Sequence, residues 1–365
     1  MVRKIVLTGG PGSGKTTVLN KIKQIYEQQG IKVIVVSETA TDLLNSGISF
    51  LDNTISLLDF QEMVLRLQLT KEDIVDRTIN YSTKEDILVI YDRGIIDNTA
   101  YISKEEFDII LKRVCNDSFS DLLNRYDLVI NLVGREDFYT TENNKARSEK
   151  VDQALELGKK TLYSWIGHKN LKIVKPKDSI DEKINEVLNI INELLEKNRV
   201  KRQEKYSVDL LKSNIDEVLN NSKCACIEQV YLEAEENVEK RLRKIEFNDS
   251  ISYIFSVYKV INGKKVIIEE NVIDKELYSN LLEFRDKKYG IIRKKRYYFT
   301  YDGGYFYLDI FNDNKEIGIL ETNVLENEKV VIPSFISVLE NVTNNDSYYN
   351  RMIAYKKGKE LKKND

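Results

Sequence analysis

Apolar and polar residues follow two different patterns along the chain, one in each half. Up to about residue 176, short continuous apolar runs alternate with longer segments whose apolar residues recur three and four positions apart. Continuous runs are typical of parallel strands covered on both faces, and the wider spacing is typical of helices. This alternation predicts a doubly wound α/β sheet with ligands at the carboxyl ends of its strands. The strand candidates are residues 4–8, 32–37, 87–91, 128–133 and 171–174.

After about residue 225 the pattern changes to short segments in which apolar and polar residues alternate. Turn signals separate them, including Asn262-Gly263 and Asp302-Gly303-Gly304. One helix is expected at 275–289. Many antiparallel strands with a single side helix predict a closed or nearly closed α+β barrel. The strand candidates are residues 226–232, 239–245, 252–260, 264–272, 294–300, 305–311 and 317–324.

Helical and charged segments join the two patterns. Apolar positions from 179 to 196 trace one helical face, and a second short helical pattern covers 209–219. We interpret the charged run between them, 197–205, as a solvated link. The predicted organisation is a first domain at 1–178, a helical connector at 179–222, a barrel domain at 223–358 and a tail at 359–365.

Composition narrows the functional classes. A length of 365 residues favours two domains, and a net charge of −3 argues against indiscriminate nucleic-acid binding. No apolar run approaches the roughly 20 residues of a membrane span, and the chain enters a strand at once, so we expect no signal peptide. Cys115, Cys224 and Cys226 form neither a zinc pattern nor a disulfide framework. We therefore expect a cytoplasmic protein, and a single histidine, His168, disfavours Ser-His-Asp catalysis.

The segment Gly9–Thr16, G-G-P-G-S-G-K-T, follows the first apolar run and precedes a helical pattern. This is the context that the phosphate-loop motif G-x-x-x-x-G-K-[ST] requires. Glycines let successive backbone N–H groups point into one anion-sized hollow, and the helix adds its positive end. Lys15 would reach the β- and γ-phosphates, and Thr16 would ligate Mg²⁺. The expected partner is therefore a nucleoside triphosphate. Its expected binding residues are Gly9, Gly10, Pro11, Gly12, Ser13, Gly14, Lys15, Thr16 and Thr17.

Polar residues follow the second and third strand candidates. Glu38 could accept a proton from a hydroxyl that is being phosphorylated, or it could cap the next helix. Asp92 is expected to hold Mg²⁺ and Arg93 to meet phosphate or substrate, although a salt-bridged pair at a strand end is the alternative. Gly94 is expected to let the chain turn away beside the site.

A polar insertion follows the fourth strand candidate. Arg135 and Arg147 within it could close on the transferring phosphate as part of a lid, or they could be solvated loop residues. Trp165 and His168 precede the last strand candidate, and we favour a packing role for both.

The first half resembles the P-loop kinases of the AAA or ribosylnicotinamide kinase type and of the deoxynucleoside kinase type. This resemblance implies a five-stranded core, Mg²⁺-NTP at the loop, an acceptor pocket near Glu38 and Asp92–Arg93, and a lid that carries Arg147. It does not define the acceptor. The motifs that carry it are G-G-P-G-S-G-K-T-T, S-E-T-A-T at 37–41, F-Q at 60–61, Y-D-R-G at 91–94, F-Y-T-T-E-N-N-K-A-R at 138–147 and W-I-G-H at 165–168.

Basic residues in the second half share strand faces. Arg241 and Arg243 lie on one face of their strand, and Lys294 and Arg296 lie on one face of theirs. If these point inward with Lys259, they line a basic tunnel suited to a polyphosphate or a phosphorylated headgroup. If they point outward, they protect a sheet surface.

The second half is similar to the CYTH or triphosphate-tunnel family, which binds or hydrolyses triphosphates with metal held by alternating glutamates. The family's first-strand E-x-E-x-K reads here as Cys226-x-Glu228-x-Val230, and its later E-x-E reads as Glu321-x-Asn323. Losing two carboxylates favours binding over hydrolysis, with Glu228 and Glu321 kept as candidate ligand residues. The similarity is carried by I-E-Q-V-Y-L at 227–232, R-L-R at 241–243, K-K-R at 294–296, L-D-I-F at 308–311, L-E-T-N at 320–323, P-S-F-I-S-V-L-E-N-V-T at 333–343 and Y-Y-N at 348–350.

The order of the two halves resembles a family of P-loop/CYTH-like proteins that includes the animal TRPL translocation defect protein. This resemblance implies GTP binding and phosphoinositide recognition. Three hypotheses stay open at this point. The chain is an Mg²⁺-dependent phosphotransferase or NTPase that uses ATP or GTP, with a barrel that binds a small phosphorylated or nucleoside-like ligand. Alternatively it is a nucleotide-dependent switch with a phosphate- or phosphoinositide-binding barrel, or a bifunctional enzyme whose barrel cleaves triphosphate.

Overall fold

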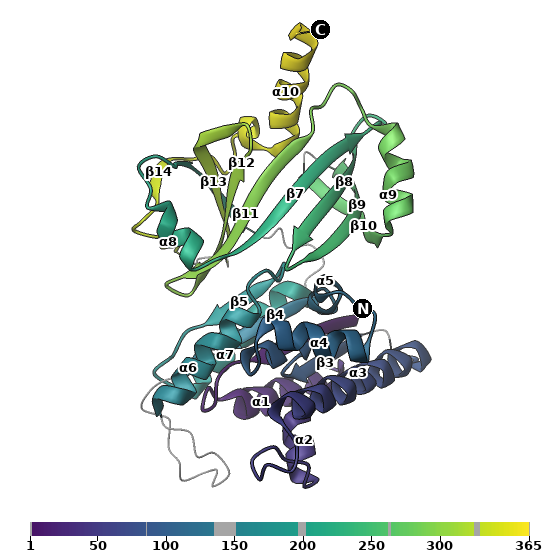
Figure 1. Ribbon diagram of the computed structural model, residues 1–365, viewed down its shortest axis with the longest axis vertical. Helices are drawn as coiled ribbons and strands as arrows, with labels where there is room; N and C mark the ends of the chain where they lie inside the picture. The colour runs from purple at the N-terminus through teal and green to yellow at the C-terminus, as the bar shows by residue number, and fades with distance from the viewer. Residues whose placement is uncertain are drawn as a thin grey trace. The chain divides into compact units, whose positions relative to one another are not determined.

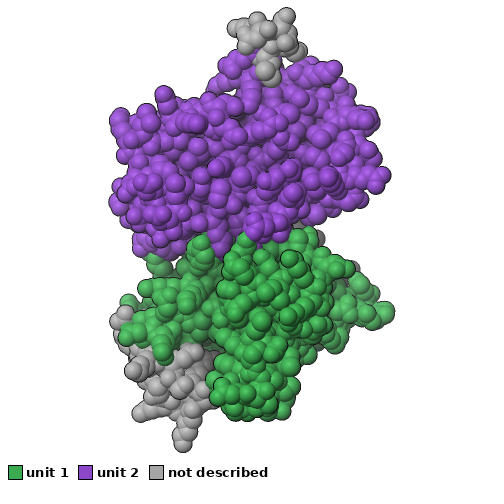
Figure 2. All heavy atoms as spheres, in the orientation of Figure 1, with its two compact units in different colours: residues 1–200 green, residues 201–365 purple. Residues whose placement is uncertain are grey.

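A computed structural model of the chain describes residues 2–84, 86–134, 151–195, 202–261, 264–324 and 329–364. The chain forms two compact units, residues 1–200 and 201–365 (Figure 2). The sequence prediction placed a separate connector at 179–222. The boundary between the two units falls inside this stretch. Its first helix, Ile180–Leu195, contacts the last strand of the first unit, and residues 202–209 pair with a strand of the second.

Unit 1 contains a five-stranded parallel sheet in the order β2-β3-β1-β4-β5 (Figure 1). The buried strands are apolar along nearly their whole length, as expected of strands covered on both faces. This confirms the predicted doubly wound sheet, and it brings the ends of β1 to β4 to one edge. The strands are β1 (Val2–Thr8), β2 (Lys32–Val36), β3 (Ile87–Asp92), β4 (Leu128–Leu132) and β5 (Leu171–Val174).

The helices of unit 1 begin at ordinary sequence signals. Ser56 caps its helix by accepting from the N–H of Asp59, and Ser103 and Glu106 form a reciprocal capping box. The helices are α1 (Lys15–Gln28), α2 (Thr39–Asn45), α3 (Leu57–Tyr81), η1 (Ile95–Ala100), α4 (Lys104–Val114), α5 (Phe119–Leu123), α6 (Val151–Ser164) and α7 (Ile180–Leu195).

Unit 2 is built on a nine-stranded antiparallel sheet in the order β10-β9-β8-β7-β11-β12-β13-β6-β14. Figure 1 shows that the sheet is strongly curved. Within the described residues β10 and β14 each pair with one neighbour, so the sheet has two edges rather than a hydrogen-bonded closure. The strands are β6 (Arg202–Asp209), β7 (Lys223–Leu232), β8 (Val238–Phe247), β9 (Ser250–Ile261), β10 (Lys264–Ile273), β11 (Ile292–Tyr301), β12 (Gly304–Phe311), β13 (Asn314–Val324) and β14 (Ser337–Asn341).

Two short helices, α8 (Ile215–Asn220) and α9 (Lys275–Leu281), pack on one face of this curved sheet, whereas Ala354 of the C-terminal helix packs on the other face with Tyr231 and Phe311. Val218 of α8 joins an apolar cluster with Phe299 and Leu320, and Tyr278 of α9 joins another with Leu242. The remaining elements are η4 (Leu282–Phe284), η5 (Asp346–Tyr348) and α10 (Asn350–Asn364). Among the described residues, no helix combines the length and apolar character needed to cross a membrane.

Three element predictions were wrong in this unit. The range 197–205 was interpreted as a link, yet residues 202–205 begin strand β6. They escaped notice because their side chains are polar, and the sheet has a polar face. The helix predicted at 209–219 is limited to residues 215–220, and the one predicted at 275–289 ends at residue 284.

Candidate functional site

The phosphate loop connects β1 to α1 and is shaped by glycines with positive φ. Gly9 has a φ of 141° and Gly14 a φ of 85°. Gly14 is the N-cap of α1 and provides no side-chain cap, and the first turn of the helix carries no acidic residue. The backbone N–H groups of that turn are therefore available to an anion, which the helix dipole also favours.

Two neighbouring elements press against this loop. A Cβ atom on Gly9 would lie 2.2 Å from the carbonyl oxygen of Leu132, at the end of β4. A Cβ atom on Gly10 would lie 2.8 Å from the Cα of Gly158 in α6. The loop glycines are thus needed for close packing as well as for their torsion angles. Gly158 was not predicted, although an isolated glycine inside a helical pattern is a recognised sign of close approach.

Lys15 lies over the loop that it belongs to. It is 7% exposed, and its Nζ donates to the carbonyl oxygens of Gly9 at 3.1 Å and Gly10 at 3.4 Å. The Ser13 hydroxyl is buried without a hydrogen-bond partner, and Thr16 and Thr17 are exposed in the first turn of α1. Backbone N–H groups, an ammonium and hydroxyls therefore come together on one loop, which has the chemistry of a phosphate site.

The ends of β2 and β3 bring a carboxylate and a guanidinium together. The Nε of Arg93 donates to Oε1 of Glu38 at 2.5 Å, and both side chains are largely buried. Glu38 is the N-cap residue of α2 but makes no side-chain cap hydrogen bond. Arg93 pairs with Glu38 rather than with its neighbour Asp92. The capping alternative for Glu38 and the Asp92–Arg93 salt-bridge alternative are therefore both wrong.

The turn after β3 also differs from the prediction. Gly94 has an extended backbone, and the positive φ belongs to Arg93, at 68°. Gly94 is small for another reason, since a Cβ atom there would lie 2.9 Å from both the ring of Trp165 and a methyl group of Val6. A left-handed backbone at an arginine is a strained conformation that the surrounding structure must hold.

Electrostatics separate the two carboxylates near the loop. Burial favours the protonated form of Glu38, but the charges of Arg93 and Lys15 outweigh it and lower its pKa to about 2. Burial raises the pKa of Asp92, and the Lys15 charge offsets this only in part. Its Oδ1 is buried without a partner. An unsatisfied carboxylate oxygen near a phosphate site fits a cation, and carboxylate and hydroxyl oxygens such as those of Asp92 and Thr16 suit Mg²⁺.

Asp97, which the sequence analysis missed, holds the strand ends in place. This buried carboxylate accepts from the Thr8 hydroxyl at 2.6 Å, the Gly94 N–H at 2.8 Å and the Trp165 indole N–H at 3.1 Å. Trp165 and His168 are fully buried, and His168 contacts the Tyr126 carbonyl oxygen through Nε2 at 3.0 Å. These contacts agree with the packing role expected for both.

Unsatisfied polar atoms also lie on the helices next to this edge. Gln61 of α3 and Asn98 of η1 are 4% and 5% exposed, and Oε1 of the first and Nδ2 of the second are buried without partners. The Nη1 atom of Arg93 is in the same condition. Buried polar atoms without partners are uncommon and indicate groups that a ligand completes. Arg135 and Arg147 of the predicted lid lie outside the described residues.

In unit 2, charged side chains gather on the sheet face opposite α8 and α9. Strand pairing places Arg241 beside Tyr231, Arg243 beside Gln229 and Arg296 beside Asp309, all with the same orientation. We call this set the charged face. Four of the five basic residues named for this half in the sequence analysis therefore share one face of the sheet. The members of the charged face are Lys205, Glu239, Arg241, Arg243, Glu270, Lys294, Arg296, Asp309 and Glu321.

Carboxylates already neutralise much of this face. Asp309 accepts from Lys294 at 2.5 Å and from Arg296 through two bonds of 2.7 Å. Glu321 pairs with Lys205 at 3.0 Å and with Arg296 at 3.2 Å. Burial would raise the pKa of Asp309, yet the charges of Arg296 and Lys294 hold it well below its usual range.

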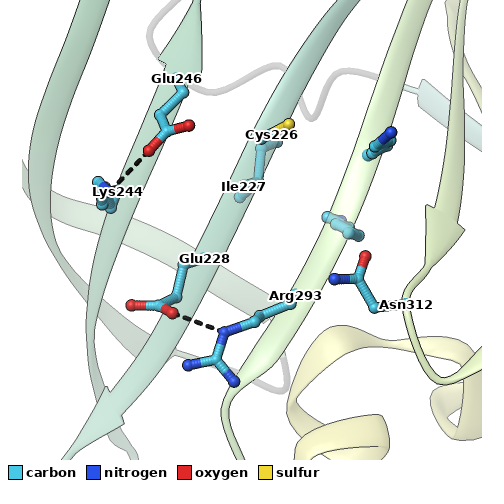
Figure 3. Close-up of a pocket in the computed structure, with 9 residues that line it drawn as sticks. Cys226, Ile227, Glu228, Lys244, Glu246, Arg293 and Asn312 are labelled. Carbon is cyan, nitrogen blue, oxygen red and sulfur yellow. Dashed lines mark hydrogen bonds and ion pairs between the residues drawn. The ribbon is translucent and has the colours of Figure 1, made fainter.

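Two residues predicted to bind a ligand on the charged face, Glu228 and Lys259, lie on the opposite face of the sheet. Glu228 is opposite Lys244 and pairs with Arg293 at 2.8 Å, which puts it on the other face of the sheet. With Lys244 and Glu246 this pair lines a groove of about 180 Å³. Figure 3 shows the Glu228–Arg293 pair and its two neighbours. Lys259 is exposed and lies opposite Val238, also on that other face. Successive side chains of a strand point to opposite faces of the sheet, so a shift of one residue in the predicted alignment moves a side chain to the other face.

The structure also changes how the first strand is compared with the tunnel family. On β7 the side chains on the charged face are those of Ile227, Gln229 and Tyr231, and none of them is a carboxylate. Among the described residues, no group of three or more His, Cys, Asp or Glu side chains is arranged to hold a metal. The described carboxylates therefore give no support to a metal-dependent triphosphatase on the charged face.

Comparisons with known proteins agree with the geometry of unit 1. Residues 4–183 match the family described as AAA domain. A thymidylate kinase of Mycoplasma capricolum is 26% identical over 207 residues, which cover 53% of this chain and 96% of the relative. A thymidylate kinase of Buchnera aphidicola is 27% identical over 190 residues, which cover 48% of this chain and 84% of the relative. The first unit is therefore similar in sequence to an AAA domain and to two thymidylate kinases.

Solved structures provide a weaker comparison. The inorganic triphosphatase NE1496 is 19% identical with a TM-score of 0.32, covering 43% of this chain and 95% of that one. The PH1819 protein of Pyrococcus horikoshii OT3 is 16% identical with a TM-score of 0.28, covering 34% of this chain and 80% of that one. Likeness at this level carries no functional argument, so the strand pairing of unit 2 alone defines its architecture.

Proposed function

We propose that the chain is an Mg²⁺-dependent phosphotransferase of the nucleoside- or nucleotide-kinase kind, with ATP or GTP as phosphoryl donor. The observation that carries this proposal is the uncapped glycine loop with Lys15 over it, next to the Glu38–Arg93 pair and the unpartnered oxygen of Asp92. The thymidylate kinases that resemble unit 1 support the same reaction class.

Each residue has a distinct role in this proposal. The loop N–H groups and Lys15 bind the β- and γ-phosphates, and Arg93 neutralises charge on the transferred group. Thr16 and Asp92 would hold Mg²⁺, which supplies charge neutralisation between the phosphates. Arg147 would complete the site as the lid residue predicted from the sequence.

Glu38 is a weak base because its pKa is about 2. Phosphoryl transfer passes through a loose transition state that needs little help from a base. In this proposal Glu38 therefore orients the acceptor hydroxyl by accepting its hydrogen bond, and it takes the proton only as the new P–O bond forms. The Gln61 Oε1 could accept a hydrogen bond from the substrate that receives the phosphoryl group, and the Asn98 Nδ2 could donate one to it. A nucleobase edge offers both kinds of group.

Radiolabelled γ-phosphoryl transfer tests the proposal. The full chain is incubated with Mg²⁺ and ATP or GTP and a panel of nucleosides and nucleoside monophosphates that includes thymidine and thymidylate. Transfer to at least one acceptor, reduced on the order of 100-fold or more by Lys15→Ala, supports it. Slow hydrolysis that no acceptor accelerates would favour the nucleotide-dependent switch instead.

A second function is favoured by the charged face, which we propose binds a polyphosphate or phosphorylated headgroup without hydrolysing it. Arg243 pairs with Glu270 at 2.6 Å through Nη2, yet the Nε atoms of Arg241 and Arg243 are buried without partners. Burial together with the Arg241 charge lowers the pKa of Arg243 despite that pair. Both observations fit a missing anion. Within the part of the chain that the structure describes, no three carboxylates gather closely enough to hold a metal for cleavage.

Tripolyphosphate and an inositol polyphosphate are suitable probes in a Lys15→Ala chain, which removes the competing loop. We expect each probe to raise the melting temperature with or without EDTA. We expect Arg243→Ala to lower the affinity for the probe about tenfold. Lys259→Ala is the matched control, because this cation lies on the other face and its loss should leave the affinity unchanged. Release of orthophosphate from tripolyphosphate would favour the bifunctional enzyme.

A further inference from the structure

A buried lysine from α7 contacts the underside of the phosphate loop. Lys183 is 7% exposed and lies on the apolar stripe of its helix with Ile184 and Val187. Its Nζ donates to the carbonyl oxygen of Ser13 at 3.1 Å and to that of Val133 at 2.9 Å. An ammonium on a buried stripe is costly unless it is hydrogen-bonded, so these two carbonyl contacts explain its position.

The contact with Ser13 determines the direction of one loop amide. The Ser13 carbonyl and the Gly14 N–H belong to the same peptide unit, and in a planar trans peptide they point in opposite directions. A lysine that holds this carbonyl oxygen towards α7 therefore directs the Gly14 N–H to the side of the peptide opposite Lys183. Gly14 has the left-handed φ of 85°, a conformation that packing must select among the many open to glycine.

The second contact ties the loop to the end of β4. Val133 directly follows Leu132, whose carbonyl oxygen is the atom that approaches Gly9 most closely. The start of the loop thus rests on β4 directly, and its later part is joined to β4 through Lys183. Both contacts fix the loop relative to the sheet before any ligand binds, which reduces the ordering cost of binding.

We propose that Lys183 is a positioning residue for the phosphate-binding amides. It acts through the Ser13–Gly14 peptide, so that the donor's phosphates meet an N–H that is already oriented. This inference rests on the proposed function and adds to it a residue from a distant element. A lysine at a core position of an otherwise apolar helical stripe is the signal in the sequence that could have revealed it.

Calorimetric titration with ADP and with the non-hydrolysable triphosphate analogues of ATP and GTP tests this proposal. Lys183→Met should weaken triphosphate affinity tenfold or more, about 1.4 kcal/mol, and raise the KM for the nucleotide. The KM for the acceptor should stay within about twofold, because the acceptor does not contact this peptide. Lys183→Arg, which keeps a donor and the charge, should recover most of the affinity.

Val187→Ala is the matched control, since it removes buried volume one turn along the same helix, and its apolar side chain cannot donate to the Ser13 carbonyl oxygen. It should lower the melting temperature but leave nucleotide affinity unchanged. Should Lys183→Met not fold, Lys183→Gln replaces it, with an expected loss of threefold or more. Unchanged affinity in the lysine variants, or an equal loss in Val187→Ala, overturns the inference alone. A wild-type chain that binds no nucleotide overturns the proposed function and this inference together.

Discussion

The phosphate loop of unit 1 offers backbone N–H groups and polar atoms without partners, whereas the charged face of unit 2 offers side-chain cations that are mostly paired. An anion can enter the loop without displacing an internal partner, apart from the Lys15 contacts with carbonyl oxygens. On the charged face an anion must compete with Asp309 and Glu321 for the same guanidinium and ammonium groups. The loop therefore suits tight binding of a phosphate group. On the charged face, a bound anion would replace the carboxylates that pair with the cations.

The largest expected effect concerns the stability of unit 2. Asp309→Asn leaves Lys294 and Arg296 buried without a full counter-charge, which should lower the free energy of unfolding by about 3–5 kcal/mol. Chemical denaturation measures this change. Asp313→Asn is the matched control, because Asp313 is exposed and pairs with Lys357 at the surface, and it should cost less than about 1 kcal/mol. Equal losses in the two variants would mean that the charged face is not an internally balanced network.

A smaller effect is expected in the loop, where steric fit rather than charge is important. Gly9→Ala places a Cβ atom 2.2 Å from the Leu132 carbonyl oxygen at a positive φ, and should cost about 2–4 kcal/mol and weaken nucleotide binding. Gly30 also has a positive φ, of 82°, but a Cβ atom there meets nothing within 4 Å. Gly30→Ala should therefore cost about 1 kcal/mol and leave binding intact. Similar costs would show that backbone strain alone limits the loop.

These two regions also differ in how far the sequence revealed them. The phosphate loop was predictable because its residues are adjacent in the chain and their spacing is set by one turn and one helix. The charged face depends on strand parity, and the sequence analysis put Glu228 and Lys259 on the wrong side. β6 was missed because its residues on the charged face are polar. The segment therefore lacks the alternation of apolar and polar residues that usually reveals a strand.

Contacts between distant elements were equally hidden. Asp97 and Lys183 support the loop from segments far along the chain, and local patterns do not reveal which carbonyl or hydroxyl they meet. The ends of the parallel strands could be anticipated as the site, but the pairing of Arg93 with Glu38 could not. That pairing depends on the left-handed turn at Arg93, a conformation that propensities assign to glycine.

The smallest expected effect is a pH dependence of unit 1. The pKa of Glu38 is lowered from 4.5 to about 2, so its pairing stabilises the folded state fully above the unfolded value. This contribution is lost as the pH falls from about 4.5 towards 2. Glu38→Gln should therefore be less stable than wild type at pH 7, with a difference that shrinks steadily below pH 4.5 in denaturation experiments. A difference that grows on acidification would contradict the ion pair.

The central claim is that the nucleotide is held by the amide-lined loop of unit 1 and not by the charged face of unit 2. Calorimetric titration of Mg²⁺ with a non-hydrolysable triphosphate into wild type, Lys15→Ala and Arg243→Ala chains tests it most directly. We predict one tight site per chain in wild type and Arg243→Ala, and loss of that site in Lys15→Ala. Tight binding that survives Lys15→Ala and disappears in Arg243→Ala would contradict the account.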